Sequence, residues 1–115
     1  MKEKYLSIEN HPNYEVSNMG NVRNKKTGKV LRPYLGPGGY LNVKLDGQNC
    51  KVHILVATTH VPNPDNKPIV NHKRGKKQDP RASQLEWVTQ SENVKHAWET
   101  GLRKKVRKNR SRKKL

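Results

Sequence analysis

Residues 69–93 of the chain read IVNHKRGKKQDPRASQLEWVTQSEN. The two short apolar runs in this stretch, IVNH and LEWV, predict strands, and the charged segment between them, which contains glycine and proline, predicts a loop. Thr89 and Glu92 have the spacing of a capping box, which predicts the first turn of a helix that ends at Gly101. We therefore expect a strand, a long loop, a second strand and a helix.

Three polar side chains of this stretch can converge on one point. Asn71 and His72 end the first predicted strand, and Asn93 lies in the first turn of the predicted helix. A neutral histidine, whose reference pKa is about 6.5, can remove a proton from water. Amide oxygens can hold Mg²⁺, which completes its shell with water and phosphate. These parts suit phosphodiester hydrolysis, while a loop histidine that only forms hydrogen bonds is the simpler alternative for His72.

Residues 14–53 are predicted to be rich in β-strands. Asn18-Met19-Gly20 predicts a tight turn between two short runs, and Thr27-Gly28 predicts a second turn. Residues 40–45 alternate apolar and polar side chains, Asp46-Gly47 predicts a hairpin turn, and residues 48–52 form the returning strand. The side chains expected to face the core are Leu41, Val43 and Leu45. The side chains expected on the opposite face, as solvated surface or as nucleic-acid contacts, are Tyr40, Asn42 and Lys44.

Composition and charge limit the class of protein. The chain has 115 residues, with 25 Lys and Arg against nine Asp and Glu, and a formal net charge of +16, which predicts an anionic partner. The single cysteine, Cys50, cannot form an internal disulfide and excludes zinc knuckles built on cysteine pairs. The sequence contains no apolar run of membrane-spanning length, and its N-terminus lacks the pattern of a signal peptide. We expect a soluble intracellular protein.

The C-terminal segment differs from the rest of the chain. Residues 102–115 carry nine cations and no acid. Like charges at this density do not share a packed core, so we expect a disordered or transiently helical arm that becomes ordered along a phosphate backbone. The alternative is a nuclear-localisation or solubilising tail.

Two motif sets resemble a known family. VHILVA, VNH, LEWVT and SEN occur in order within residues 52–101 and resemble the HNH nuclease module of phage-type homing endonucleases. Upstream, YEVSNMGNVR and GGY, within residues 8–45, resemble the β-rich DNA-binding motif that accompanies these nucleases. The pattern of residues 53–61 alone does not decide between a helix and a strand. The resemblance favours a helix for residues 54–60. The resemblance covers about residues 5–101.

The resemblance implies an α+β fold in three parts. An antiparallel β module occupies residues 1–50, a ββα-metal nuclease module residues 51–101, and a flexible basic tail residues 102–115. In the second part His72 is the implied general base, and Asn71 and Asn93 are the implied ligands of one Mg²⁺ or Mn²⁺ ion per site, with no zinc. That ion stabilises the 3′ leaving oxygen. The residues with implied structural roles are His53, Gln84 and Trp87, the last in a small core with Leu85, Val88 and Trp98.

The implied partner is double-stranded DNA, cleaved by a monomer or weak dimer in the cytoplasm of a phage-infected or host cell, with no membrane contact. A monomer has one site and is expected to nick one strand unless two copies meet on the duplex. The cations expected to grip phosphates beside the base are Lys73, Arg74, Lys76 and Lys77. The β-module residues expected to contact DNA are Arg23, Lys25, Lys26, Tyr40, Asn42 and Lys44. The tail residues expected to do so are Arg103, Lys104 and Lys105.

Three positions depart from the family pattern. Before the histidine the family has Asp or Asn, and this chain has the uncharged Asn71. Arg74 stands where the family usually has an acid, and Gln84 where it usually has an asparagine. The main alternative is therefore a catalytically inactive nucleic-acid-binding protein on the same scaffold. A small basic RNA-associated protein is a third hypothesis, which gives no reason for a capped Asn93 opposite Asn71 and His72.

Overall fold

The computed structural model describes residues 2–99, and side chains up to Lys95. The strands are β1 (Tyr5–Ile8), β2 (His11–Ser17), β3 (Val22–Asn24), β4 (Tyr34–Leu35), β5 (Leu41–Leu45), β6 (Gln48–Lys51), β7 (Ile69–His72) and β8 (Leu85–Val88). The helices are α1 (Val52–His60) and α2 (Gln90–Glu99), and the 3-10 turns are η1 (Pro37–Gly39) and η2 (Ala82–Gln84). In this part of the chain the mixture of small sheets and few helices agrees with the predicted α+β class.

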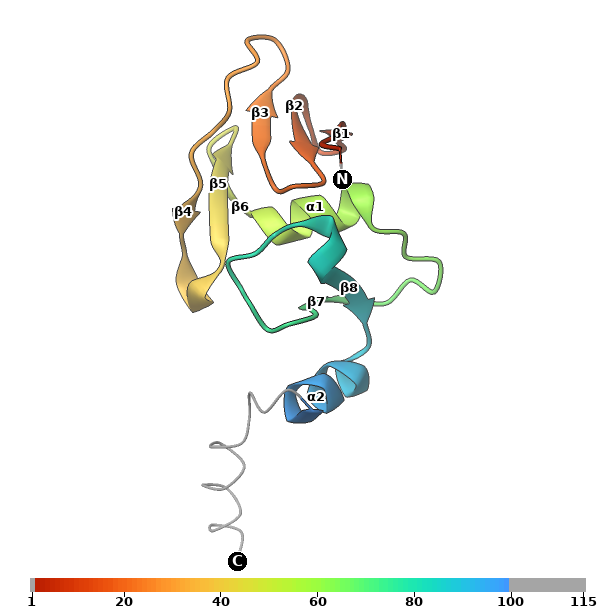
Figure 1. Ribbon diagram of the computed structural model, residues 1–115. Coiled ribbons are helices and arrows are strands. Elements are labelled where there is room, and N and C mark those ends of the chain that lie inside the picture. Colours follow the sequence, from red (N-terminus) through yellow and green to blue (C-terminus); the bar gives the residue numbers. More distant parts are fainter. Residues whose placement is uncertain (1, 100–115) are drawn as a thin grey trace, which may run out of the picture.

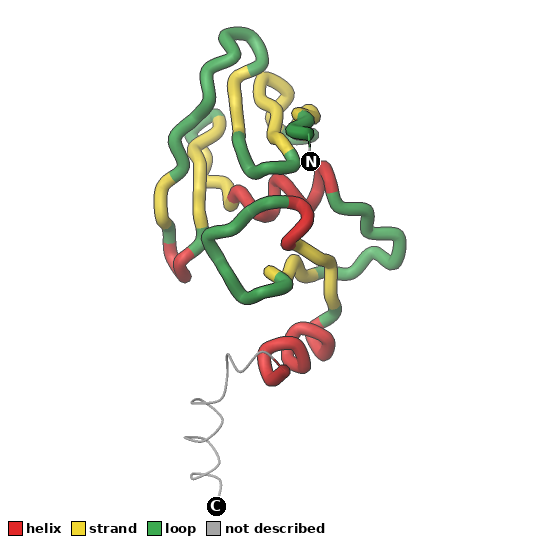
Figure 2. Tube along the Cα trace, viewed as in Figure 1, coloured by secondary structure: helices red, strands yellow, loops and turns green. Residues whose placement is uncertain are grey.

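The strands form three small antiparallel sheets around one helix. The sheets have the orders β1-β2-β3, β4-β5-β6 and β7-β8. Figures 1 and 2 show α1 crossing the middle of the molecule, with the β1–β2–β3 sheet on one side of it, the β7–β8 hairpin on the other, and the β4–β5–β6 sheet beside one end of the helix. Helix α2 lies beyond that hairpin, so the hairpin separates the two helices.

Two predicted turns have the backbone geometry that their residues favour. Gly20, between β2 and β3, has a φ of 92°, and a Cβ there would lie 2.5 Å from Cγ of Pro80. Asp46 and Gly47, between β5 and β6, have φ values of 51° and 80°, which fits a two-residue hairpin turn with positive φ at both positions. The predicted hairpin is confirmed, and the Gly20 turn packs tightly against the loop before β8.

One hydrophobic core joins the two halves of the described chain. Its buried members from the N-terminal half are Ile8, Val16, Val22, Val43 and Leu45, and those from the C-terminal half are Val52, Leu55, Val56, Ala57 and Leu85. Helix α1 begins directly after β6 and supplies most of the second group. Residues on both sides of the predicted boundary at 50/51 therefore pack in one core.

The structure resolves the open choice for residues 53–61 in favour of helix. Helix α1 begins at Val52 rather than at residue 54, and ends before Pro62. The sequence did not predict β1, the first residues of β2, or the two-residue β4. β1 and β4 are short edge strands, and β2 begins with His11, Pro12 and Asn13, so the hydrophobic patterns of these segments are weak.

The predicted polar face of β5 is correct for Lys44 and wrong for Asn42 and Tyr40. Lys44 is exposed, but Asn42 is only 5% exposed and its Nδ2 donates to the carbonyl oxygen of Tyr40 at 3.0 Å. The loop that contains η1 folds back over β5: a Cβ at Gly36 would lie 2.1 Å from Nδ2 of Asn42. This cover removes Asn42 from solvent and turns Tyr40 toward α1.

The start of α2 agrees with the predicted capping box. The backbone N–H of Glu92 donates to Oγ1 of Thr89 at 3.2 Å, and that of Thr89 donates to Oε1 of Glu92 at 2.9 Å. Lys67 Nζ lies 3.0 Å from the same carboxylate and ties the helix to the segment before β7. The expected helix end at Gly101, the packing of Trp98, and the tail with Arg103, Lys104 and Lys105 lie outside the described residues.

Neither described helix has the length and apolar character that crossing a membrane requires.

Candidate active site

The β7–β8 hairpin presents two different faces. In its register His72 pairs with Leu85, and Asn71 pairs with Glu86. Successive side chains of a strand point to opposite faces, so the side chains sharing the face toward α1 are Val70, His72, Leu85 and Trp87. Those on the other face are Ile69, Asn71, Glu86 and Val88. Helix α2, which carries Asn93, packs against both strands.

His72 is buried in a cluster of three rings. It is 6% exposed, and its ring centroid lies 4.8 Å from that of His53 and 5.7 Å from that of Tyr40. Tyr40 stacks on His53 at 4.7 Å, with 22° between the ring planes. Among the described residues, Nε2 of His72 and Nδ1 of His53 are buried without a hydrogen-bond partner.

This environment keeps both imidazoles neutral at neutral pH. Burial lowers the pKa of His53 to about 4, and the nearby His72 and Lys51 contribute to the decrease. Burial also lowers the pKa of His72, and Lys77 adds to this effect, while Asp79 opposes it. A general base must start unprotonated, so the lowered pKa of His72 suits that role.

Backbone contacts hold the end of β7. The N–H of Gly75 donates to the carbonyl of His72, and the N–H of Lys73 donates to the carbonyl of Gln84, both at 2.8 Å. The second contact uses the backbone of Gln84, so a glutamine can make it as well as an asparagine. Asp79, which influences the pKa of His72, is itself bound by Arg81 at 2.8 Å.

Asn71 has a partner that the sequence analysis did not identify. Its Nδ2 donates to Oε2 of Glu86 at 2.9 Å, across the hairpin. This bond directs the NH₂ group toward Glu86 and leaves the carboxamide oxygen, Oδ1, as the atom that can meet a cation. Pairing the two predicted strands as a hairpin would have placed Glu86 opposite Asn71. This pairing is the sequence signal that could have revealed the contact.

The three predicted site residues lie on adjacent elements. Asn71 and His72 leave opposite faces of β7, and the half-buried Asn93 lies in the first turn of α2. Their convergence on one cation stays a prediction. Trp87 fits its expected structural role, because it packs against the core and its Nε1 donates to the carbonyl of Val61 at 3.0 Å.

The donors near Asn71 suit a hard cation. In the described part of the chain no three His, Cys, Asp or Glu side chains cluster to hold a metal. A cation beside Asn71 would therefore meet carboxamide oxygens and water, with the Glu86 carboxylate close by. Oxygen donors of this kind match the preference of Mg²⁺, which keeps several waters.

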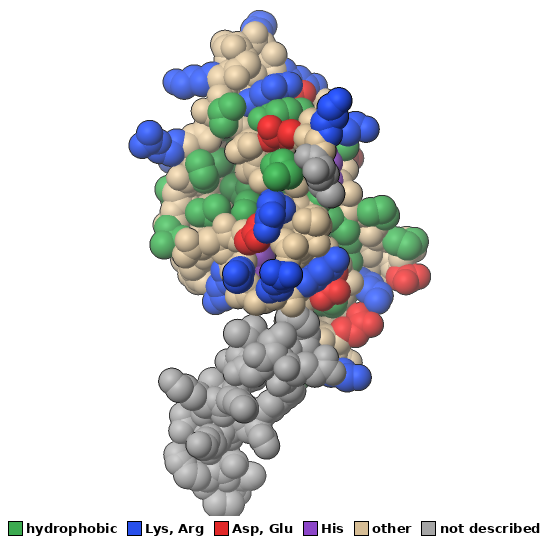
Figure 3. Space-filling view, viewed as in Figure 1, with side chains coloured by type: hydrophobic (Ala, Val, Ile, Leu, Met, Phe, Trp, Pro, Cys, Tyr) green, Lys and Arg blue, Asp and Glu red, His purple; other side chains and the backbone are tan. Residues whose placement is uncertain are grey.

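Cations surround the end of β7. Figure 3 shows Lys and Arg side chains gathered beside a histidine, in the region where Figure 1 places the hairpin and its loop. The exposed loop residues are Lys73, Arg74, Lys76 and Lys77. Lys77 Nζ donates to the carbonyl of Gly38 at 3.0 Å and lies 5.3 Å from the centroid of Tyr40. The positive charge therefore extends from the loop to the β module.

The β-module residues expected to contact DNA divide into free and engaged ones. Lys25 and Lys26 are exposed in the turn after β3. Arg23, in contrast, pairs with Glu15 at 2.6 Å and lies 3.6 Å above the ring of Tyr5. A base contact by Arg23 would have to break these interactions.

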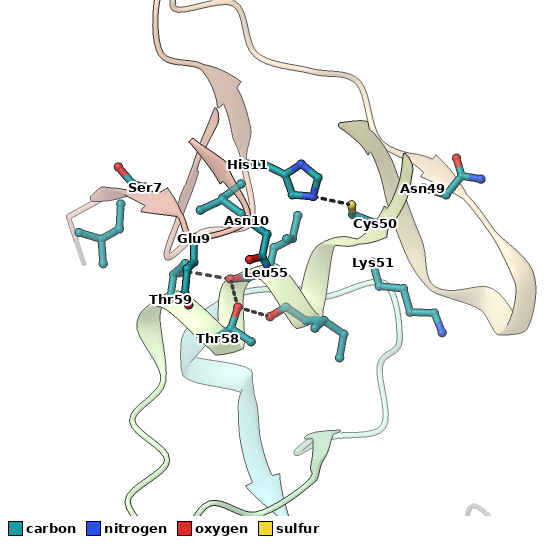
Figure 4. A pocket seen from close by; sticks show the side chains of 13 residues that line it. Ser7, Glu9, Asn10, His11, Asn49, Cys50, Lys51, Leu55, Thr58 and Thr59 are labelled. Atoms are coloured by element: carbon teal, nitrogen blue, oxygen red, sulfur yellow. Dashed lines mark hydrogen bonds between the residues drawn. The ribbon is translucent and has the colours of Figure 1, made fainter. Parts of the chain in front are cut away.

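A second hollow lies away from the ring cluster. Its cavity of about 690 Å³ is lined in part by Cys50 and His11. Figure 4 shows these side chains between the β1–β2 turn and α1. His11 Nε2 lies 3.8 Å from Sγ of Cys50, and its Nδ1 lies 3.0 Å from Asp46. Burial raises the pKa of the Cys50 thiol, which disfavours the reactive thiolate. The hydroxyls of Thr58 and Thr59, which also line this hollow, donate to carbonyls of α1.

Comparison with known proteins relates the whole arrangement to one family. A model described as the NUMOD4 motif matches residues 3–46. An uncharacterized HNH endonuclease of Acanthamoeba polyphaga mimivirus is 49% identical over 106 residues. A solved structure described as DNA binding and cleavage by the HNH homing endonuclease I-HmuI matches with a TM-score of 0.76 and 32% identity, and covers 85% of this chain. The chain is a homologue of the HNH homing endonucleases.

The chain spans only part of the length of the relatives that it matches. The alignment with the mimivirus protein covers 86% of this chain but only 26% of the mimivirus protein. Against DNA endonuclease I-HmuI of Bacillus phage SP01 it is 35% identical over 92 residues, which cover 76% of the chain and 53% of the phage protein. The solved structure is likewise covered to 59%. The NUMOD4 match, residues 3–46, includes the upstream motif set YEVSNMGNVR and GGY.

Proposed function

We propose that the chain is a divalent-metal-dependent DNA endonuclease that hydrolyses a phosphodiester bond with His72 as general base. The observation that carries this proposal is the neutral, buried His72 at the end of β7, beside a loop of exposed cations. The names of its homologues support the same reaction.

In this proposal His72 accepts the proton of the attacking water at an imidazole nitrogen. Its neutral state makes the lone pair available, and the packed rings limit its rotation. Water attack on phosphorus breaks the bond to the 3′ oxygen, so the products carry 5′-phosphate and 3′-hydroxyl ends. General-base catalysis of this kind contributes roughly 10²- to 10⁴-fold to a rate.

Asn71 and Asn93 would hold one Mg²⁺ or Mn²⁺ ion through their carboxamide oxygens. When bound, the ion neutralises charge on the phosphate and on the 3′ leaving oxygen. Glu86 supports this assignment because it fixes the carboxamide of Asn71 and places a negative charge beside it. Asn71 lacks the charge of an aspartate, and the neighbouring carboxylate of Glu86 compensates for part of that difference.

Double-stranded DNA is the proposed substrate. The exposed loop cations would hold phosphates on either side of the scissile bond, while Lys25, Lys26 and Lys44 would contact the duplex farther away. Binding that rests mainly on phosphate contacts is strongly salt-dependent and weakly sequence-specific. A monomer with one such site would nick one strand.

The decisive experiment incubates supercoiled plasmid with the wild-type chain and Mg²⁺ or Mn²⁺, beside His72→Ala and a chelator control. We expect conversion to nicked circles by the wild type, and none with His72→Ala or chelator. Asn10→Ala, which removes an exposed carboxamide far from His72, serves as a control and should cleave normally. Plasmid binding without cleavage under either metal would instead support the inactive DNA-binding alternative.

A further inference from the structure

Tyr40 belongs to the β module but packs inside the nuclease site. We infer that Tyr40 is a positioning residue for His72: its ring, stacked on His53 and tilted against His72, holds the imidazole in its working orientation. This inference rests on the proposed function for the role of His72. It gives the N-terminal motif a part in the chemistry besides DNA contact.

The backbone of Tyr40 is held before its ring makes any contact. Its carbonyl oxygen accepts the N–H of Gly36 at 2.8 Å and Nδ2 of Asn42 at 3.0 Å. Gly38, with a φ of 76°, allows the chain to reverse between them. Lys77 closes the loop from the other side by donating to the carbonyl of Gly38. The loop is therefore pre-organised, which makes the direction of the Tyr40 side chain a fixed property of the fold.

The rings replace a support that histidine bases usually have. A hydrogen bond to the second ring nitrogen commonly fixes a functional imidazole. Among the described residues none reaches Nε2 of His72, which is buried, and Nδ1 of His53 is in the same situation. Orientation of the two imidazoles then depends on their packed faces, and Tyr40 supplies the outer face of the stack.

Two ammonium groups contact the same tyrosine ring. Lys51 Nζ lies 5.6 Å and Lys77 Nζ 5.3 Å from its centroid, within the range of cation–π attraction. These contacts hold the ring from the solvent side, while His53 contacts it from inside. Tyr40 thus lies between the buried histidines and the two lysines. An aromatic ring at this position can stack on His53 and also attract the ammonium groups.

The test compares Tyr40→Leu with Tyr40→Phe in the full chain. Phenylalanine keeps the ring and removes only the hydroxyl, whereas leucine removes the ring. In proton NMR spectra we expect ring-current shifts of the His53 and His72 imidazole protons in the wild type and Tyr40→Phe, and their loss in Tyr40→Leu. Single-turnover cleavage at saturating DNA should fall roughly 10- to 100-fold in Tyr40→Leu and change less than about two-fold in Tyr40→Phe, with DNA affinity nearly constant.

The outcomes separate this inference from the proposed function. Unchanged imidazole shifts and an unchanged rate in Tyr40→Leu would overturn the positioning role while leaving the nuclease intact. A wild type without cleavage would overturn the function, and the imidazole shifts would still report on the ring contacts. If Tyr40→Leu does not fold, nuclear Overhauser contacts between Tyr40 and the two histidine rings in the wild type decide the geometry, and their absence would refute it.

Discussion

The α1-facing and α2-facing sides of the β7–β8 hairpin alternate along the same two strands but hold their polar groups in different ways. On the first side His72 is enclosed by rings, and its Nε2 has no partner among the described residues. On the second side the carboxamide of Asn71 is bound to a carboxylate. Burial on the first side favours the neutral form of the His72 imidazole. The second side holds the carboxamide oxygen of Asn71 beside the carboxylate of Glu86.

The difference matters because the proposed reaction needs two incompatible environments. A cation in contact with an imidazole favours its neutral form but competes for the lone pair that must take a proton. A strand that sends adjacent side chains to opposite faces keeps His72 and the oxygen donors one residue apart without direct contact. In the proposed reaction both groups act on one phosphate at the strand end.

Removing the base should have the largest effect. His72→Ala is expected to lower the single-turnover cleavage rate roughly 10³-fold, within the usual range for loss of a general base. DNA affinity should change little, because the loop cations remain. Rate measurements at saturating DNA, with gel-shift measurements beside them, check both parts. A rate within ten-fold of the wild type would show that the α1-facing side does not carry the base.

Removing the cation ligand on the other face should have the next effect. Asn71→Ala is expected to raise the Mn²⁺ concentration needed for half-maximal cleavage about 10- to 100-fold, and to weaken Mn²⁺ binding measured by electron paramagnetic resonance. Asn10→Ala provides the matched carboxamide control. Normal Mn²⁺ binding by Asn71→Ala would remove this residue from the proposed ligands.

A smaller effect is expected at Glu86, which contacts Asn71 rather than substrate. Glu86→Gln keeps a hydrogen-bond acceptor but loses the charge, and Glu86→Leu loses both. We expect the Mn²⁺ requirement to rise a few-fold in the first variant and roughly ten-fold in the second. Equal behaviour of the two variants would mean that the charge, not the orientation of Asn71, is what Glu86 contributes.

Several elements around both faces could be predicted from the sequence alone. The strands around His72, the hairpin at Asp46-Gly47 and the capping box at Thr89 depend on local patterns, and the structure contains all three. Within residues 53–61, whose periodicity is ambiguous, the family resemblance favoured helix for residues 54–60, and the structure has a helix over Val52–His60. Local signals and motifs were sufficient for these elements.

The positions of Tyr40, Asn42 and Glu86 could not be found in the same way. Alternation along residues 40–45 placed Tyr40 and Asn42 on a polar face, because nothing local shows that the loop with Gly36 folds back over the strand. The contact of Glu86 with Asn71 depends on the cross-strand pairing of β7 and β8, which the local sequence around Glu86 does not show. Likewise, the sequence alone does not show that Arg23, which was expected to contact DNA, pairs with Glu15 on the neighbouring strand.

The pH dependence of stability tests the α1-facing side of the hairpin. The pKa of His53 is about 4 in the fold, against about 6.5 for an unfolded histidine. Between these values the unfolded chain binds more protons, so the free energy of unfolding should be full above about pH 6.5 and fall as the pH drops toward 4. The loss attributable to this group is on the order of 1–2 kcal/mol at pH 5.

His53→Phe tests this effect, because it keeps a ring against Tyr40 and removes the titrating nitrogen. Urea unfolding at pH 7 and pH 5 should show a smaller decrease in the variant than in the wild type, and the decrease that remains comes from His72 and the carboxylates, which titrate in both proteins. The comparison also sharpens the difference between the two faces: an acid-sensitive stability that disappears with His53 is a property of the buried ring cluster. A decrease of the same size in both proteins would mean that the α1-facing side tolerates a charged imidazole, and burial would then not be what keeps His72 neutral.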